Sequence, residues 1–186
     1  RATLTAMRES PVQSANYRVE IVGGNFQRAS AGDRLISPLS VRVVNPANSS
    51  PLADLPVQFY SVEPGIMFSD PMARTNEYGV AMTNATLDQI AGRKVITARV
   101  PESPAEIAFE VYSLAREADS IRPIITTDLK MRSRQTSSNP LVVSVQDIYG
   151  NPVSGVAIDW SYVEGGGRLD ADPSTLGAKA MIETNE

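Results

Sequence analysis

The feature that most constrains this chain is an internal repeat about one domain long. The run Pro51-Leu-Ala-Asp-Leu-Pro-Val-Gln-Phe-Tyr-Ser-Val-Glu-Pro-Gly65 aligns with Pro152-Val-Ser-Gly-Val-Ala-Ile-Asp-Trp-Ser-Tyr-Val-Glu-Gly-Gly166 at a constant offset (152 − 51 = 101 and 166 − 65 = 101). The matched pairs are Pro51 and Pro152, Leu55 and Val156, Val57 and Ile158, Phe59 and Trp160, Val62 and Val163, Glu63 and Glu164, and Gly65 and Gly166. Because this period is the length of one β-sandwich, we expect two copies of such a domain.

Alternating apolar residues in both copies predict strands with one face on a core. A period of two places these side chains on the same side of a sheet. Turn signals separate about seven short strands in the first copy, and no stretch shows a clean helical period. The chain is therefore predicted to be all-β, with tandem immunoglobulin-like β-sandwiches. The alternating positions are Leu39, Val41, Val43, Val57, Phe59, Ile96, Ala98, Val100, Ile107, Phe109 and Val111 in the first copy, and Leu141, Val143, Val145, Val156, Ile158 and Trp160 in the second.

Composition argues against several classes of function. The chain has no cysteine and no histidine, which removes disulfides, thiolate metal sites, the usual general base and the commonest metal ligand. We therefore expect no enzyme, with no catalytic, cofactor-binding or metal-binding residues. The net charge of −4, with mixed signs along the chain, predicts no nucleic-acid partner. No apolar run approaches the ~20 residues of a membrane span, so none is expected in this chain.

One turn of the second copy has the residue types of a cation site. Asp147 and Asn151 lie in the run Asp147-Ile-Tyr-Gly-Asn-Pro152. Calcium needs six or more oxygen ligands, and no dense cluster of acidic residues supplies them here. We expect an Asx turn, in which the Asp147 side chain caps the backbone.

The other candidate residues favour structural interpretations. Glu63 and Glu164 occupy equivalent positions of the repeat, so they are expected to be structural. Trp160 shares the apolar face of its strand, which predicts core packing over stacking on a sugar. Gly165-Gly-Gly167 lacks the lysine and helix of a phosphate loop and predicts a turn. Lys130, Arg132 and Arg134 are expected on a solvated face. Asn48-Ser-Ser50 and Asn84-Ala-Thr86 fit the glycosylation pattern, and we expect no role for them.

Two stretches carry a family resemblance. The run Asn139-Pro-Leu-Val-Val-Ser-Val-Gln-Asp-Ile-Tyr-Gly-Asn-Pro-Val-Ser-Gly-Val-Ala-Ile-Asp-Trp160 resembles two strands and their turn in bacterial Ig-like domains of the invasin and intimin type. Thr75-Asn-Glu-Tyr-Gly-Val-Ala81 and Lys94-Val-Ile-Thr-Ala-Arg-Val100 resemble a later turn and strand of the same domains. The first copy departs from the pattern, with Asn45-Pro-Ala-Asn-Ser-Ser-Pro51 at the turn.

The repeat and the resemblance divide the chain into three parts. We expect residues 1–16 to be remnant strands of a preceding repeat, residues 17–114 a complete domain, and residues 115–186 an incomplete domain that lacks its last strands. A competing register makes residues 1–22 the closing hairpin of the preceding repeat. Two explanations of the partial ends are open. The chain is a window from a longer repeat protein, or the N-terminal strands of one subunit complete the C-terminal sandwich of the next and build a filament.

The resemblance implies a function outside catalysis. Domains of this type act as stalks, spacers and adhesive units on bacterial surfaces. We therefore expect a structural or adhesive component of an extracellular stalk or filament, with neighbouring repeats or copies of itself, head to tail, as partners. The alternatives are a module that binds a host receptor, matrix component or glycan, and an accessory domain of a larger secreted enzyme.

Overall fold

The computed structural model describes residues 16–124 and 141–161, and the backbone of a last strand at residues 180–183. These described residues form strands, bridges and turns, and none of them is helical, so the all-β prediction is confirmed. The chain forms two compact units. The first contains Arg1–Ala29, Asp33–Asp88 and Arg93–Tyr112, and the second contains Ser30–Gly32, Gln89–Gly92 and Ser113–Glu186.

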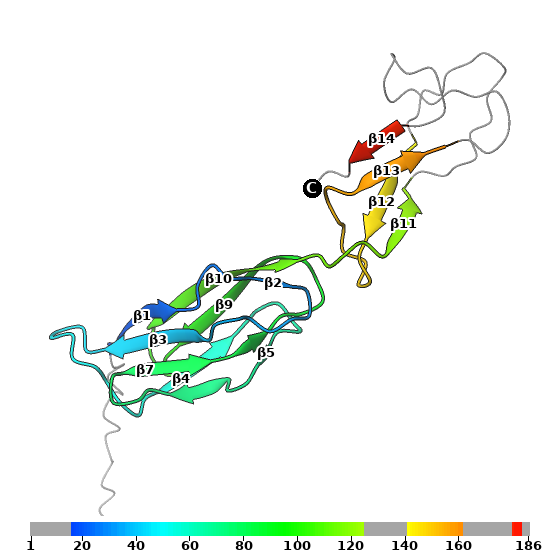
Figure 1. Cartoon of the computed structure of the whole chain (residues 1–186). Helices are drawn as coiled ribbons and strands as arrows, with labels where there is room; N and C mark the ends of the chain where they lie inside the picture. The colour runs from blue at the N-terminus through cyan, green and yellow to red at the C-terminus, as the bar shows by residue number, and fades with distance from the viewer. Residues whose placement is uncertain (1–15, 125–140, 162–179, 184–186) are drawn as a thin grey trace, which may run out of the picture. The chain divides into compact units, whose positions relative to one another are not determined.

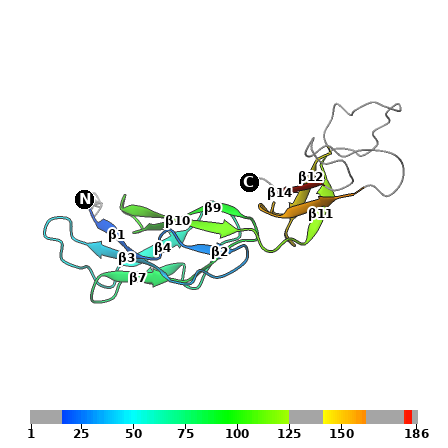
Figure 2. The same cartoon turned by 45° about the horizontal axis from the view of Figure 1, so that its top comes forward.

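The first unit is built on two facing sheets (Figures 1 and 2). The smaller sheet has the order β1-β3-β7, the larger one has the order β2-β10-β9-β4-β6, and β5 pairs with β8 at one end. The strands are β1 (Arg18–Gly23), β2 (Arg28–Ser30), β3 (Leu39–Val44), β4 (Pro56–Tyr60), β5 (Met67–Phe68), β6 (Met72–Arg74), β7 (Val80–Thr83), β8 (Ala85–Thr86), β9 (Gly92–Arg99) and β10 (Glu106–Leu114).

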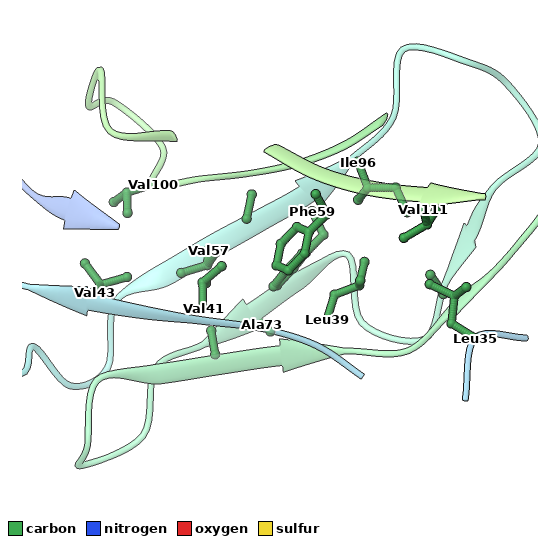
Figure 3. Close-up of a cluster of buried hydrophobic side chains, with 14 of the residues drawn as sticks. Leu35, Leu39, Val41, Val43, Val57, Phe59, Ala73, Ile96, Val100 and Val111 are labelled. Carbon is green, nitrogen blue, oxygen red and sulfur yellow. The ribbon is translucent and has the colours of Figure 1, made fainter. Parts of the chain in front are cut away.

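The core lies between the two sheets and is made by the alternating residues. Figure 3 shows Phe59 among aliphatic side chains from both sheets. Burying this apolar area is the main favourable term in folding, which explains why the period-two pattern predicted the strands. The fully buried members on the predicted positions are Leu39, Val41, Val43, Val57, Phe59, Ile96, Ala98, Val100, Phe109 and Val111. The pattern missed the two- and three-residue strands β2, β5 and β6, which are too short to show a period.

The second unit contains two strand pairs. β11 (Ser120–Pro123) pairs with β12 (Val143–Gln146), and β13 (Ala157–Trp160) pairs with β14 (Ala180–Glu183), both antiparallel. Val145 is buried as predicted. The inward placement of Leu141 was wrong, because this side chain is 45% exposed and precedes the first residue of β12.

The strand pairs of the two units share one register. In the first unit Pro56 pairs with Arg74, and in the second Ala157 pairs with Glu183. The paired residues on β4 and β13 are separated by the repeat offset (157 − 56 = 101). The paired residues on β6 and β14 are separated by more (183 − 74 = 109). Met72-Ala-Arg-Thr-Asn-Glu77 therefore corresponds to Met181-Ile-Glu-Thr-Asn-Glu186, across a connection that is longer in the second copy. A search at one constant offset could not find this second match.

Candidate functional site

The turn that begins at Asp147 is closed by its own carboxylate. Oδ1 of Asp147 accepts hydrogen bonds from the backbone N–H groups of Tyr149 at 2.9 Å and Asn151 at 2.8 Å. The Asp147 N–H donates to the carbonyl oxygen of Asn151, and the Gly150 N–H donates to that of Asp147, both at 2.9 Å. The predicted Asx turn is thereby confirmed.

The same turn occurs in the first unit. Oδ1 of Asn76 accepts from the N–H groups of Tyr78 and Val80, both at 3.0 Å, and the Asn76 N–H donates to the Val80 carbonyl oxygen at 2.9 Å. Asn76-Glu-Tyr-Gly-Val80 and Asp147-Ile-Tyr-Gly-Asn151 are therefore two versions of one five-residue turn. They differ at the last position, where only the second has a side chain able to form hydrogen bonds.

The second oxygen of Asp147 is also occupied by donors. Oδ2 accepts from the Arg116 N–H and from Nδ2 of Asn151, both at 2.9 Å, and the residue is only 2% exposed. Burial alone raises the pKa of Asp147, but the hydrogen bonds from Asn151, Arg116 and Tyr149 outweigh it and lower the pKa to about 2. A carboxylate that four N–H groups already surround stabilises a turn. Its lone pairs are not left for a cation.

Asn151 extends this arrangement to another segment of the second unit. Its Oδ1 accepts from the Ala91 N–H at 2.8 Å, and its Nδ2 donates to the Gln89 carbonyl oxygen at 2.9 Å. These two bonds give Gln89 and Ala91, which lie outside any strand, hydrogen-bond partners for their backbone. Because Asn151 is buried, the bonds are shielded from water.

Arg116 joins a further segment of the same unit. Its Nε donates to the carbonyl oxygen of Ala31 at 2.8 Å, and its guanidinium carbon lies 5.6 Å from the centre of the Tyr149 ring, within cation–π range. We call Asp147, Asn151, Arg116 and Tyr149 the Asp147 network. Within the second unit it connects segments that lie far apart in the sequence.

A second polar cluster is buried in the first unit. Lys94 is only 4% exposed, although it is charged. Its Nζ lies 3.0 Å from Oδ2 of Asp88 and 3.2 Å from Oε2 of Glu63. Burial lowers the pKa of Lys94, but its hydrogen bonds to Asp88 and Glu63 outweigh this and raise the pKa overall. We call these three residues the Lys94 cluster.

The loop after β4 is shaped to bring Glu63 to this cluster. Gly65 has a φ of 96°, and an added Cβ there would lie 2.9 Å from the Cβ of Asp88, so only glycine allows this approach. Ser61 Oγ donates to the carbonyl oxygen of Val95 at 3.1 Å and accepts from the Glu63 N–H at 3.2 Å. The predicted structural role of Glu63 therefore has a physical basis.

Lys94 and Asp88 were not predicted as site residues, although the position of Lys94 in its strand carries a signal. Lys94 has the same parity as Ile96, Ala98 and Val100, so the alternation along β9 already placed it on the inward face. A lysine at a core position needs a buried partner. The partner could not be identified, because Asp88 lies outside any regular strand.

The remaining candidates fall into two groups. Trp160 is partly buried, and its enclosed Nε1 has no hydrogen-bond partner among the described residues, so the ring does not form an open platform for a sugar. Oδ1 of Asn48 accepts from the Ser50 N–H within a turn, and Nδ2 of Asn84 lies 3.5 Å from Ser69 Oγ. The others lie outside the described residues, namely Glu164, Gly165–Gly167, Lys130, Arg132 and Arg134.

The described part of the chain contains no group of three or more aspartate or glutamate side chains placed to hold a metal ion. It also contains no helix of the length and apolarity needed to cross a membrane.

No protein-family model matches this sequence, and no curated protein matches it. Solved structures are nevertheless similar to it. The D00-D0 domain of intimin is 20% identical, with a TM-score of 0.41, over 53% of this chain and 45% of its own. The Escherichia coli adhesin FdeC is 15% identical, with a TM-score of 0.49, over 77% of this chain and 46% of its own. Domains 1-6 of the surface layer protein SbsC are 10% identical, with a TM-score of 0.40, over 90% of this chain and 21% of their own.

All three similarities have identities of 20% or less and TM-scores below 0.5. The chain spans less than half the length of the intimin and FdeC structures that it matches.

Proposed function

We propose that this chain is a structural and adhesive part of an extracellular bacterial stalk built from repeated sandwiches. The observation that carries the proposal is the shared register of β4 with β6 and of β13 with β14, which indicates one module used twice. A repeated module suits a spacer. Each added copy extends the reach of the chain and needs no chemistry of its own.

The first unit has strand pairing suited to bearing load. The Phe26 N–H donates to the Glu110 carbonyl oxygen at 2.7 Å, and the Tyr112 N–H donates to that of Gln27 at 2.9 Å. Going from the first bond to the second, the position moves forward from Phe26 to Gln27 on one segment and from Glu110 to Tyr112 on the other, so the two segments are parallel. A pull on the start of β1 and the end of β10 therefore shears these bonds together and does not open them one after another.

Two measurements test the stalk proposal. Antibodies raised against the chain should label intact cells of the source bacterium, and labelling that requires permeabilised cells would contradict an extracellular role. Single-molecule pulling should use cysteines engineered at both ends, which are unambiguous handles because the chain has none of its own. We expect a distinct unfolding event for the first unit, whereas extension without any force peak would contradict a load-bearing role.

Assembly by strand complementation between subunits is the finer form of this proposal. Light scattering and negative-stain imaging of the purified chain test it directly. Regular fibres would support complementation, and a folded monomer at all concentrations would exclude it. The alternatives of a ligand-binding module and an accessory enzyme domain predict instead that the labelled chain binds host cells, a glycan array or a secreted catalytic domain.

A further inference from the structure

The Lys94 cluster brings together the reactants of a condensation. One primary amine lies between two carboxyl groups, at 3.0 Å from Asp88 and 3.2 Å from Glu63. Both distances run from Nζ to a carboxylate oxygen, so the amine is held in hydrogen-bond contact with each acid, and such proximity replaces a large part of the entropic barrier to a reaction between them. The positions are held on three sides by β9, by the contact of Gly65 with Asp88, and by the bonds of Ser61.

When its members are charged, the Lys94 cluster leaves one buried carboxylate oxygen without a hydrogen-bond partner among the described residues. Asp88 is only 9% exposed, and its Oδ1 is buried without a hydrogen-bond partner among the described residues. A carboxylate removed from water needs partners for both oxygens, and an unmatched one is costly. Glu63 differs, since its side chain is 48% exposed and remains in contact with solvent.

We propose that Lys94 and Asp88 condense into an intramolecular amide bond between Nζ and Cγ, and that Glu63 moves the protons. This covalent link goes beyond the stalk function and does not depend on it. It would replace a buried ammonium and a buried carboxylate with one neutral group, which removes most of the desolvation penalty of the pair.

The step balances without an oxidant, a cofactor or a second molecule. A proton passes from the Lys94 ammonium to the Asp88 carboxylate, which yields a neutral amine and a neutral acid. Nζ then attacks Cγ, and Glu63 accepts a proton from the nitrogen and donates it to the departing hydroxyl. The C–O bond breaks, the C–N bond remains, and one water leaves. Desolvation is what makes a lysine amine nucleophilic, and the exposed side of Glu63 lets water escape.

The raised pKa of Lys94 slows the formation of the amide bond. Its carboxylate partners hold the amine mainly in the charged form, so only the minority of neutral pairs can react. We therefore expect the bond to form slowly after folding and not during synthesis. The link would connect β9 of the large sheet to Asp88, which lies two residues after the end of β8, a strand of a separate pair.

Intact-mass spectrometry of the purified full chain tests the proposal. After prolonged incubation of the folded chain, we expect a mass lower than the sequence mass by one water. Proteolysis should then yield a branched peptide joining Asp88 to Lys94, with no tryptic cleavage after Lys94. A folded and aged chain with the full sequence mass would overturn the proposal.

Three variants separate this reaction from others that release water. Lys94→Arg retains a cation that cannot condense, so a water loss that persists in it would indicate a cyclised aspartate and overturn the proposal. Glu63→Gln should slow the water loss roughly 10²-fold or more, the lower range for general acid–base catalysis. Glu77→Gln, on an exposed turn residue, is the matched control and should react at the wild-type rate. Circular dichroism verifies that each variant is folded.

Discussion

Replacing Asn151 with alanine should release the segment Gln89–Gly92 from the turn that holds it. The substitution deletes three hydrogen bonds, from the Ala91 N–H, to the Gln89 carbonyl oxygen and to the Asp147 carboxylate. The two neutral bonds contribute about 1 kcal/mol each and the bond to the carboxylate about 1.5 kcal/mol. The local cost is therefore about 3.5 kcal/mol.

Native-state hydrogen exchange at the Ala91 amide measures this cost where it occurs. A loss of about 3.5 kcal/mol speeds exchange by roughly 300-fold, since each 1.4 kcal/mol is a factor of ten. A local measurement is preferable to a melting temperature, because a chain of two units need not unfold in one step. Asn48→Ala is the matched control, because Asn48 is an exposed turn residue whose loss should leave Ala91 unchanged. Unchanged exchange at Ala91 in Asn151→Ala would refute the reasoning.

Three further predictions concern the core, a turn and the acid range. Phe59→Ala should destabilise the first unit by about 3–5 kcal/mol in urea denaturation, whereas Met82→Ala, at a side chain 51% exposed, should change it by less than about 0.5 kcal/mol. Gly79→Ala should clearly lower the urea midpoint of unfolding, because φ is 71° at this residue and the new Cβ would lie 2.6 Å from a carbonyl oxygen of β3. Gly23→Ala is its control and should leave the midpoint unchanged, because a Cβ at Gly23 would meet no atom within 4 Å. The pKa of Asp147 is lowered from 3.8 to about 2, so the stabilisation that its carboxylate gives the turn is complete above about pH 4 and is lost as the pH falls towards 2. Hydrogen exchange at the Tyr149 amide monitors this acid transition, and Asp147→Asn should abolish it.

The sequence predicted the elements whose pattern is long enough to be periodic. Leu39, Val41 and Val43 repeat every second residue, and a strand with one buried face needs nothing more to be recognised. The strand β6 is only three residues long, and its counterpart β14 follows a connection of different length. Neither a period nor a constant offset could therefore identify this pair.

The candidate sites were predictable only to the extent that they are local. Asp147 caps a five-residue turn, and the spacing of Asp, Gly and Asn within it was sufficient to predict the bond. The bond from Asn151 to Ala91 spans 60 residues, and the pair of Lys94 with Glu63 joins a loop to a distant strand. No spacing in the sequence encodes these contacts directly.

Patterns along the chain were enough to specify the all-β class, the repeat, the inward faces of β3, β4, β9 and β10, and the capped turn at Asp147. All of these depend on interactions between residues that are neighbours along the chain, or on a copy of the same pattern. Only the tertiary structure decided which carboxylates meet Lys94 and which backbone groups meet Asn151. The physical reason is that an ionic or hydrogen-bonding side chain reaches a few ångströms, and folding alone determines what lies within that distance.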